Sequence, residues 1–150
     1  MDNESSEIKR LYDVFKKERN RANLTNIINF NIRYLFSFKE YLISKHTSST
    51  NMNTYIECMN YFLNKYLILE MKFDLFNGID SLNDFFSFHF VHKYANGTVQ
   101  RLKDFITSIK NFYKFMFEKG NINKETYEYL QFLLKEEKDN WINKMKDYEK

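Results

Sequence analysis

The segment 98–122 carries the apolar pattern that most restricts how this chain can fold. Its large apolar residues recur at alternating spacings of four and three, which is the repeat of one face of an α-helix. A second apolar line widens that face, so we expect this helix to pack against at least two others. Thr98 and Gly120 are residue types that begin and end helices. The first line consists of Leu102, Ile106, Ile109, Tyr113 and Met116, and the second of Phe105, Phe112 and Phe115.

Similar periodicities predict helices over about 5–20, 24–44, 53–70, 81–94 and 123–150. Ser81 and Asp84 have the spacing of a capping box, Asn123 is placed to cap the last helix, and the Ser/Thr/Asn cluster at 46–53 predicts a loop. The chain has 150 residues with no proline and three glycines, and it shows no long alternation typical of strands. The sequence therefore predicts an all-α fold, a single compact bundle of five to six helices formed by residues 1–150.

Composition and charge narrow the class of protein. The hydrophobic content of 43% is too high for a disordered chain, and the formal net charge of +3 is only weakly basic. Cys58 is the single cysteine, which excludes an internal disulfide, and we expect it to be buried. The first ten residues are polar and no apolar run is long enough for a membrane span. We therefore expect a cytoplasmic protein with no membrane contact.

The side of segment 98–122 that faces away from the apolar lines is basic. Lysines and polar residues recur there at spacings of three and four with no acid among them, and Asn111 lies nearby. Such side chains contact phosphates and base edges. The alternative is a solvated helix face, because lysine outnumbers arginine eighteen to five in this chain. The strip consists of Gln100, Lys103, Thr107, Lys110 and Lys114.

No group of residues predicts catalytic chemistry, a metal site or a cofactor. His89 and His92 have i, i+3 spacing, but no cysteine or acid follows at a spacing that would complete a zinc site. Glu136 and Glu137 are adjacent on a helix and therefore diverge by about 100°. With Lys135 and Lys138 beside them they are typical of a solvated face. We expect a protein that is not an enzyme.

The predicted helix at 123–150 carries an apolar line that Glu137 interrupts, so it should pack loosely near its middle. Trp141 and Met145 follow this interruption, and two interpretations remain open. Trp141 anchors the helix inside the chain, near Leu11 and Phe15, or Trp141 and Met145 bind a protein partner or a second copy across a two-fold axis. Both interpretations predict that Trp141 is at least partly buried.

Two segments, 38–63 and 98–122, carry a recognisable combination of residues. The first segment carries Phe38, Tyr41, Leu42, Ser49, Thr50 or Thr54, and Phe62. The second carries Thr98, Arg101, Leu102, Ile109, Phe112, Tyr113, Phe115, Gly120 and Ile122. With these residues the chain resembles, over about 32–122, the N-terminal core-binding domain of tyrosine recombinases, the phage-integrase SAM-like domain. The sequence has no counterpart of the recombinase catalytic Arg, His-x-x-Arg and nucleophilic Tyr.

The resemblance implies a four-helix core that clamps one face of duplex DNA, with additional helices at both ends of the chain. Its DNA-contacting positions correspond here to Gln100, Arg101, Lys103, Thr107, Lys110 and Lys114, and more weakly to Asn53, Asn60 and Asn64. We therefore expect a non-enzymatic DNA-binding or DNA-associated module. The alternative is a helical protein–protein interaction module with no nucleic-acid role.

Overall fold

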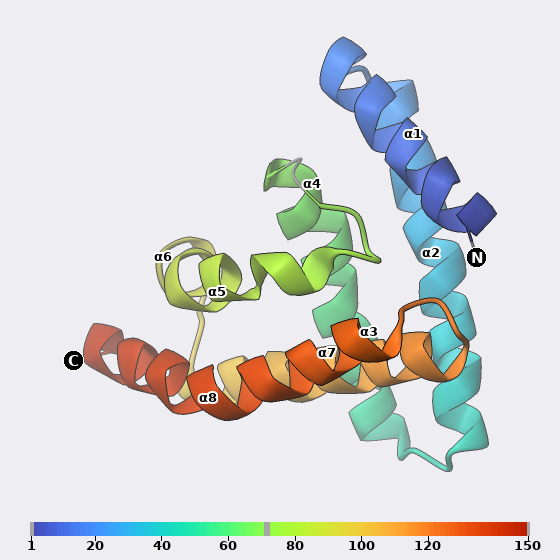
Figure 1. Cartoon of the computed structure of the whole chain (residues 1–150). Helices are drawn as coiled ribbons and strands as arrows, with labels where there is room; N and C mark the ends of the chain where they lie inside the picture. The colour runs from blue at the N-terminus through green and yellow to red at the C-terminus, as the bar shows by residue number, and fades with distance from the viewer. Residues whose placement is uncertain (1, 71–72, 150) are drawn as a thin grey trace. The chain divides into compact units, whose positions relative to one another are not determined.

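The computed structural model describes residues 2–70 and 73–149, and all regular structure in these ranges is helical (Figure 1). The predicted all-α fold class is confirmed. Within these two ranges the helices form six segments, of which the third and fourth each contain a π-helical turn. They are α1 (Asp2–Glu18); α2 (Arg21–Ser44); α3 (Ser49–Tyr61), η1 (Phe62–Tyr66) and α4 (Leu67–Glu70); η2 (Gly78–Ser81), α5 (Leu82–Asp84), η3 (Phe85–His89) and α6 (Phe90–Lys93); α7 (Val99–Glu118); and α8 (Lys124–Glu149).

The chain divides into two compact units, Met1–Gly78 and Ile79–Lys150, called here the N-terminal and C-terminal units. The core-binding-like segment at 32–122 includes parts of both. That residues 1–150 unfold as one domain stays a prediction. Lys150, the last residue of the predicted final helix, lies outside the described residues.

In the N-terminal unit, α2 packs against α1 on one side and against α3 and η1 on another. An aromatic cluster joins α2 to the segment before η2. The Tyr34 ring lies 5.4 Å from the rings of both Phe30 and Phe76, measured between centroids. All three side chains are buried, and so is Cys58, as predicted. The unit therefore has an aromatic interior of its own.

Asparagine side chains link α2 to the π-helical turn η1. The buried Asn31 amide donates to the Asn64 side-chain oxygen at 2.8 Å and to the Leu63 carbonyl at 3.4 Å. Asn64 in turn donates to Asn60 at 2.8 Å. Asn60 and Asn64, two of the weaker DNA-contact predictions, therefore also have a structural role in their unit.

In the C-terminal unit, α7 and α8 run antiparallel and side by side, and α8 also contacts η3 and α6 (Figure 1). The buried face of α7 is the one that the sequence predicts, since all eight residues of its two apolar lines are at most 5% exposed. Phe105 packs against both Phe85 and Phe90, with centroid distances of 5.3 and 5.6 Å. Burial of this face turns the basic side of α7 outward.

The end of α7 is set by Gly120. Its φ of 77° lies in the left-handed region, which glycine adopts without the clash that a Cβ would cause. The Gly120 N–H donates to the Phe117 carbonyl at 2.9 Å, and the Asn121 N–H donates to the Met116 carbonyl at 2.8 Å. This pair of hydrogen bonds is a Schellman motif, so the predicted helix end is confirmed.

Several helices begin with a residue whose side chain caps the first turn. Thr98 and Asn123 accept hydrogen bonds from the first turns of α7 and α8, as predicted. The predicted capping box at Ser81 is wrong. Ser81 has near-helical φ and ψ of −99° and −1°, whereas a cap residue needs an extended backbone, and it makes no cap hydrogen bond. Ser48 accepts from the Asn51 N–H at 3.2 Å, so α3 begins earlier than predicted and the loop before it is shorter.

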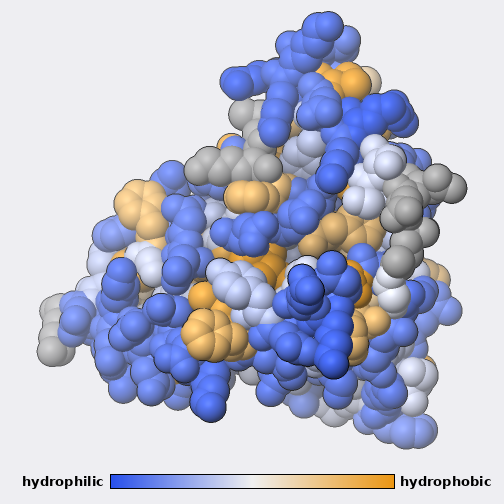
Figure 2. Space-filling view, in the orientation of Figure 1, coloured by the Kyte–Doolittle hydropathy of each residue, from blue (hydrophilic) through white to orange (hydrophobic). Residues whose placement is uncertain are grey.

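The surface in Figure 2 is predominantly hydrophilic, with hydrophobic side chains scattered between polar ones. Such scattered exposure is ordinary for a folded protein. Among the described residues, no helix has both the length and the apolarity that a membrane crossing requires.

Candidate nucleic-acid interface

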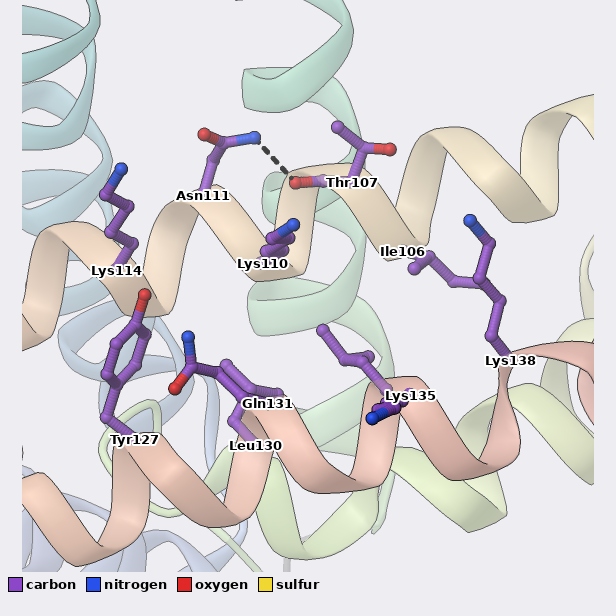
Figure 3. A pocket seen from close by; sticks show the side chains of 11 residues that line it. Ile106, Thr107, Lys110, Asn111, Lys114, Tyr127, Leu130, Gln131, Lys135 and Lys138 are labelled. Carbon is purple, nitrogen blue, oxygen red and sulfur yellow. Dashed lines mark hydrogen bonds between the residues drawn. The ribbon is translucent and has the colours of Figure 1, made fainter.

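A groove of about 530 Å³ lies between α7 and α8 of the C-terminal unit (Figure 3). Its floor is apolar and consists of Ile106, Leu130 and Leu134, all buried. Its walls are polar and basic. They are formed by Thr107, Lys110, Asn111 and Lys114 from α7 and by Tyr127, Gln131, Lys135 and Lys138 from α8. We call this feature the lysine groove.

Helical periodicity explains why these residues meet. On α8 the wall residues are four, four and three positions apart, from Tyr127 to Lys138, and residues at such spacings share a face. On α7 the wall residues adjoin Ile106 at the edge of the buried face. Because the two helices are antiparallel, each wall faces the other along several turns. The aliphatic stems of the lysines can cover the apolar floor while their ammonium groups remain in solvent.

The lining of the lysine groove contains basic side chains and no acidic ones among the described residues. Lys110, Lys114, Lys135 and Lys138 are all exposed. Within the described parts of the chain, none of these four ammonium groups forms an ion pair or a hydrogen bond. Four like charges on facing walls repel one another, and a bound anion would relieve that repulsion.

Tyr127 provides an aromatic ring at one end of the groove. The ring stacks on Phe117 with a centroid distance of 4.5 Å and an interplanar angle of 8°. Burial raises the pKa of the Tyr127 hydroxyl, and the nearby Glu118 carboxylate raises it further. The phenol is therefore protonated at neutral pH and can donate a hydrogen bond.

Three of the six predicted DNA-contacting residues, Thr107, Lys110 and Lys114, line the lysine groove. Lys103 is exposed but lies outside the lining. The structure brings Thr107, Lys110 and Lys114 together with a second wall from α8, which the sequence analysis did not predict.

The other two, Gln100 and Arg101, interact within the C-terminal unit. The Gln100 amide donates to Asp104 at 3.1 Å, and Arg101 pairs with the same carboxylate at 3.7 Å. The Arg101 guanidinium also donates to the Tyr94 hydroxyl at 3.1 Å. One helical step of about 100° separates Arg101 from Gln100, so Arg101 points away from the basic strip. A DNA contact by either residue stays a prediction.

Sequence reasoning missed the α8 wall. It interpreted Lys135 and Lys138 as part of a solvated face beside Glu136 and Glu137. The available signal was the spacing of Tyr127, Gln131, Lys135 and Lys138, which places them on one side of the helix. The adjacent acids lie outside the groove lining.

Trp141 and Met145 are buried, with exposures of 0% and 2%. The Trp141 indole N–H donates to the Asn83 side-chain oxygen at 3.0 Å, and its ring lies 4.6 Å from that of Phe86. The expected burial of Trp141 is confirmed, and these contacts anchor it within its own unit. Binding of a partner by Trp141 and Met145 stays a prediction that this packing does not favour.

The two histidines of α6 and η3 lie in different environments. His89 is buried and stacks on Phe85 at 5.6 Å. His92 is exposed, and its ring lies 5.0 Å from that of Phe88 and 5.6 Å from that of Tyr148. Among the described residues, no group of three or more His, Cys, Asp or Glu side chains could hold a metal ion.

A smaller hollow of about 200 Å³ lies in the N-terminal unit, beside the buried residues Tyr12 and Asp74. Burial raises the pKa of the Asp74 carboxyl, an effect that hydrogen bonds from Asn77 and Phe76 and the charge of Lys9 partly offset. Burial, followed by the Asp74 charge, also raises the pKa of Tyr12. The environment of Asp74 therefore disfavours its charged form.

Comparisons of the chain with protein-family models, with curated proteins and with solved structures find no match in any of the three. The resemblance to recombinase core-binding domains accordingly stays a prediction.

Proposed function

We propose that this chain is a non-enzymatic, cytoplasmic DNA-binding module that contacts phosphates through the lysine groove. The observation that carries the proposal is the set of four lysines, Lys110, Lys114, Lys135 and Lys138, which line one groove without an acidic neighbour in its lining. Ammonium groups that neutralise phosphates release counterions, and this release drives sequence-independent binding. Position within the groove matters more here than the weak net charge of +3.

The resemblance to recombinase core-binding domains supports the same function. The family presents polar sides of its helices to DNA, and three of the corresponding positions, Thr107, Lys110 and Lys114, lie in the groove lining. The groove extends this surface to a second helix. Catalysis by the chain is not part of the proposal, since recombination needs a catalytic domain that this sequence does not match.

Direct titration with DNA tests the proposal. We expect non-specific binding with a dissociation constant of roughly 10⁻⁴ to 10⁻⁶ M at moderate salt, weakening steeply as salt rises. Combining Lys103→Glu, Lys110→Glu and Lys114→Glu should abolish binding with little change in melting temperature, because all three side chains are exposed. Absence of binding at low salt, or binding that these changes leave intact, would contradict the proposal.

A second candidate function, self-association, is favoured by three exposed apolar side chains on one side of α2. Ile32, Phe36 and Ile43 are 48%, 66% and 56% exposed and lie within about 40° of one another around the helix. The exposed Lys39 lies on the same side between Phe36 and Ile43, so the apolar surface is divided into two short patches. Sedimentation of the wild type and of Phe36→Lys tests this candidate. We expect the wild type to form a concentration-dependent dimer that the variant does not form, and a wild type that stays monomeric would exclude it.

A further inference from the structure

We propose that the lysine groove binds single-stranded DNA, with an unpaired base stacked on Tyr127. This inference rests on the proposed DNA-binding function and specifies the form of DNA that the groove accepts. It follows from three features of the groove: its basic walls, its length and the aromatic ring at its end.

The availability of base faces distinguishes the two forms of DNA. A duplex presents phosphates outward and keeps the faces of its bases stacked inside, so it could contact the lysines on the rims but could not stack a base on Tyr127. A single strand exposes the faces of its bases, so it can place a base on the Tyr127 ring and phosphates against the lysine walls.

The length of the groove fits a short stretch of one strand. Eight residues separate Ile106 from Lys114 on α7, which corresponds to about 12 Å of helix. The groove can therefore hold only a few nucleotides of one strand.

Tyr127 supplies a stacking platform. Figure 3 shows its ring extending from α8 toward Lys114 of α7. Phe117 packs parallel to the ring at 4.5 Å and holds its orientation, and Tyr127 also lines the groove. Thr107 and Gln131 line the same space and offer hydroxyl and amide groups to base edges. A basic groove combined with an aromatic ring is the combination found in proteins that bind single strands without sequence preference.

Fluorescence anisotropy with three labelled probes tests the inference. The probes are a 12-nucleotide single strand, a 12-base-pair duplex and a 12-unit abasic strand with the same backbone. We expect the single strand to bind at least about tenfold more tightly than the duplex, although the duplex carries twice as many phosphates. The abasic strand should bind more weakly than the single strand, because it has nothing to stack.

Variants locate the stacking contact. Tyr127→Leu should weaken binding of the single strand by about 5- to 150-fold, the range that stacking of one base represents, and should leave the abasic strand unaffected. Tyr127→Phe keeps the ring and should retain binding. Tyr129→Leu is the matched control, since Tyr129 is 48% exposed on the same helix but outside the groove lining.

The outcomes separate this inference from the proposed function. If the duplex binds as tightly as the single strand, or if Tyr127→Leu weakens binding no more than Tyr129→Leu, the single-strand inference is wrong while DNA binding stands. If none of the probes binds, both fail. The comparison between normal and abasic strands uses the wild type alone, so a folding defect in a Tyr127 variant cannot obscure the result.

Discussion

Removal of the charge from the lysine groove gives the most direct test of how this chain contacts DNA. The variant combines Lys110→Gln, Lys114→Gln, Lys135→Gln and Lys138→Gln. If each lysine neutralises one phosphate, the wild-type affinity should fall with a logarithmic salt slope of roughly −3.6 for a duplex or −2.8 for a single strand. A rise from about 50 to 200 mM salt would then weaken binding by roughly 50- to 150-fold. The groove variant should lose most of this dependence and most of its affinity.

A matched control separates position from total charge. Four lysines that are exposed outside the groove lining, Lys17, Lys39, Lys144 and Lys146, are changed to glutamine in a second variant. Either set lowers the formal net charge by four, from +3 to −1. We expect the control to retain most of the wild-type affinity and nearly the full salt slope, since short-range phosphate contacts would be preserved.

Both variants are compared with the wild type by anisotropy titration at several salt concentrations, and their helicity and melting are checked by circular dichroism. Equal losses in the two variants would refute the reasoning, because net charge alone would then explain binding. A groove variant with an unchanged salt slope would also refute it, because the lysines would then contact no phosphates.

Four further predictions concern stability. Phe112→Ala should lower the free energy of unfolding in urea by about 3–5 kcal/mol, because Phe112 is 0% exposed, and a loss below about 1 kcal/mol would contradict its burial. Because burial raises the pKa of Asp74, the native state holds this proton more tightly than the unfolded state does. The group's contribution to stability is therefore lost as pH rises above about 4, the ordinary pKa of an aspartate. The stability of Asp74→Asn relative to the wild type should increase as pH rises from that value, and an unchanged difference would contradict that direction. Gly120→Ala should cost about 1–2 kcal/mol in thermal or urea unfolding, since φ is 77° there; a neutral effect would show that the turn relaxes. Thermal unfolding of the full chain should show one cooperative transition, and two resolved transitions would contradict a single domain.

Local sequence determined the helices and many of their ends. The four- and three-residue spacing in α7 predicted its buried face, because a helix repeats every 3.6 residues and one side must leave water. Thr98, Gly120 and Asn123 predicted helix ends because each satisfies backbone groups within a few residues of itself. The prediction that Ser81 caps a helix failed because the 3₁₀ turn that contains it gives it a near-helical backbone. The residue type alone does not reveal this conformation.

Only the tertiary structure joined the two walls of the lysine groove. Lys110 and Lys135 are far apart in sequence, and their common surface depends on how α7 and α8 align across the turn after Lys119. The same holds for Trp141, whose hydrogen bond to Asn83 spans 58 residues. Periodicity within one helix shows which side chains share a face, but the register between two helices is set by packing along their whole contact. The sequence by itself therefore identified half of the candidate site, and the packing of a second helix supplied the other half.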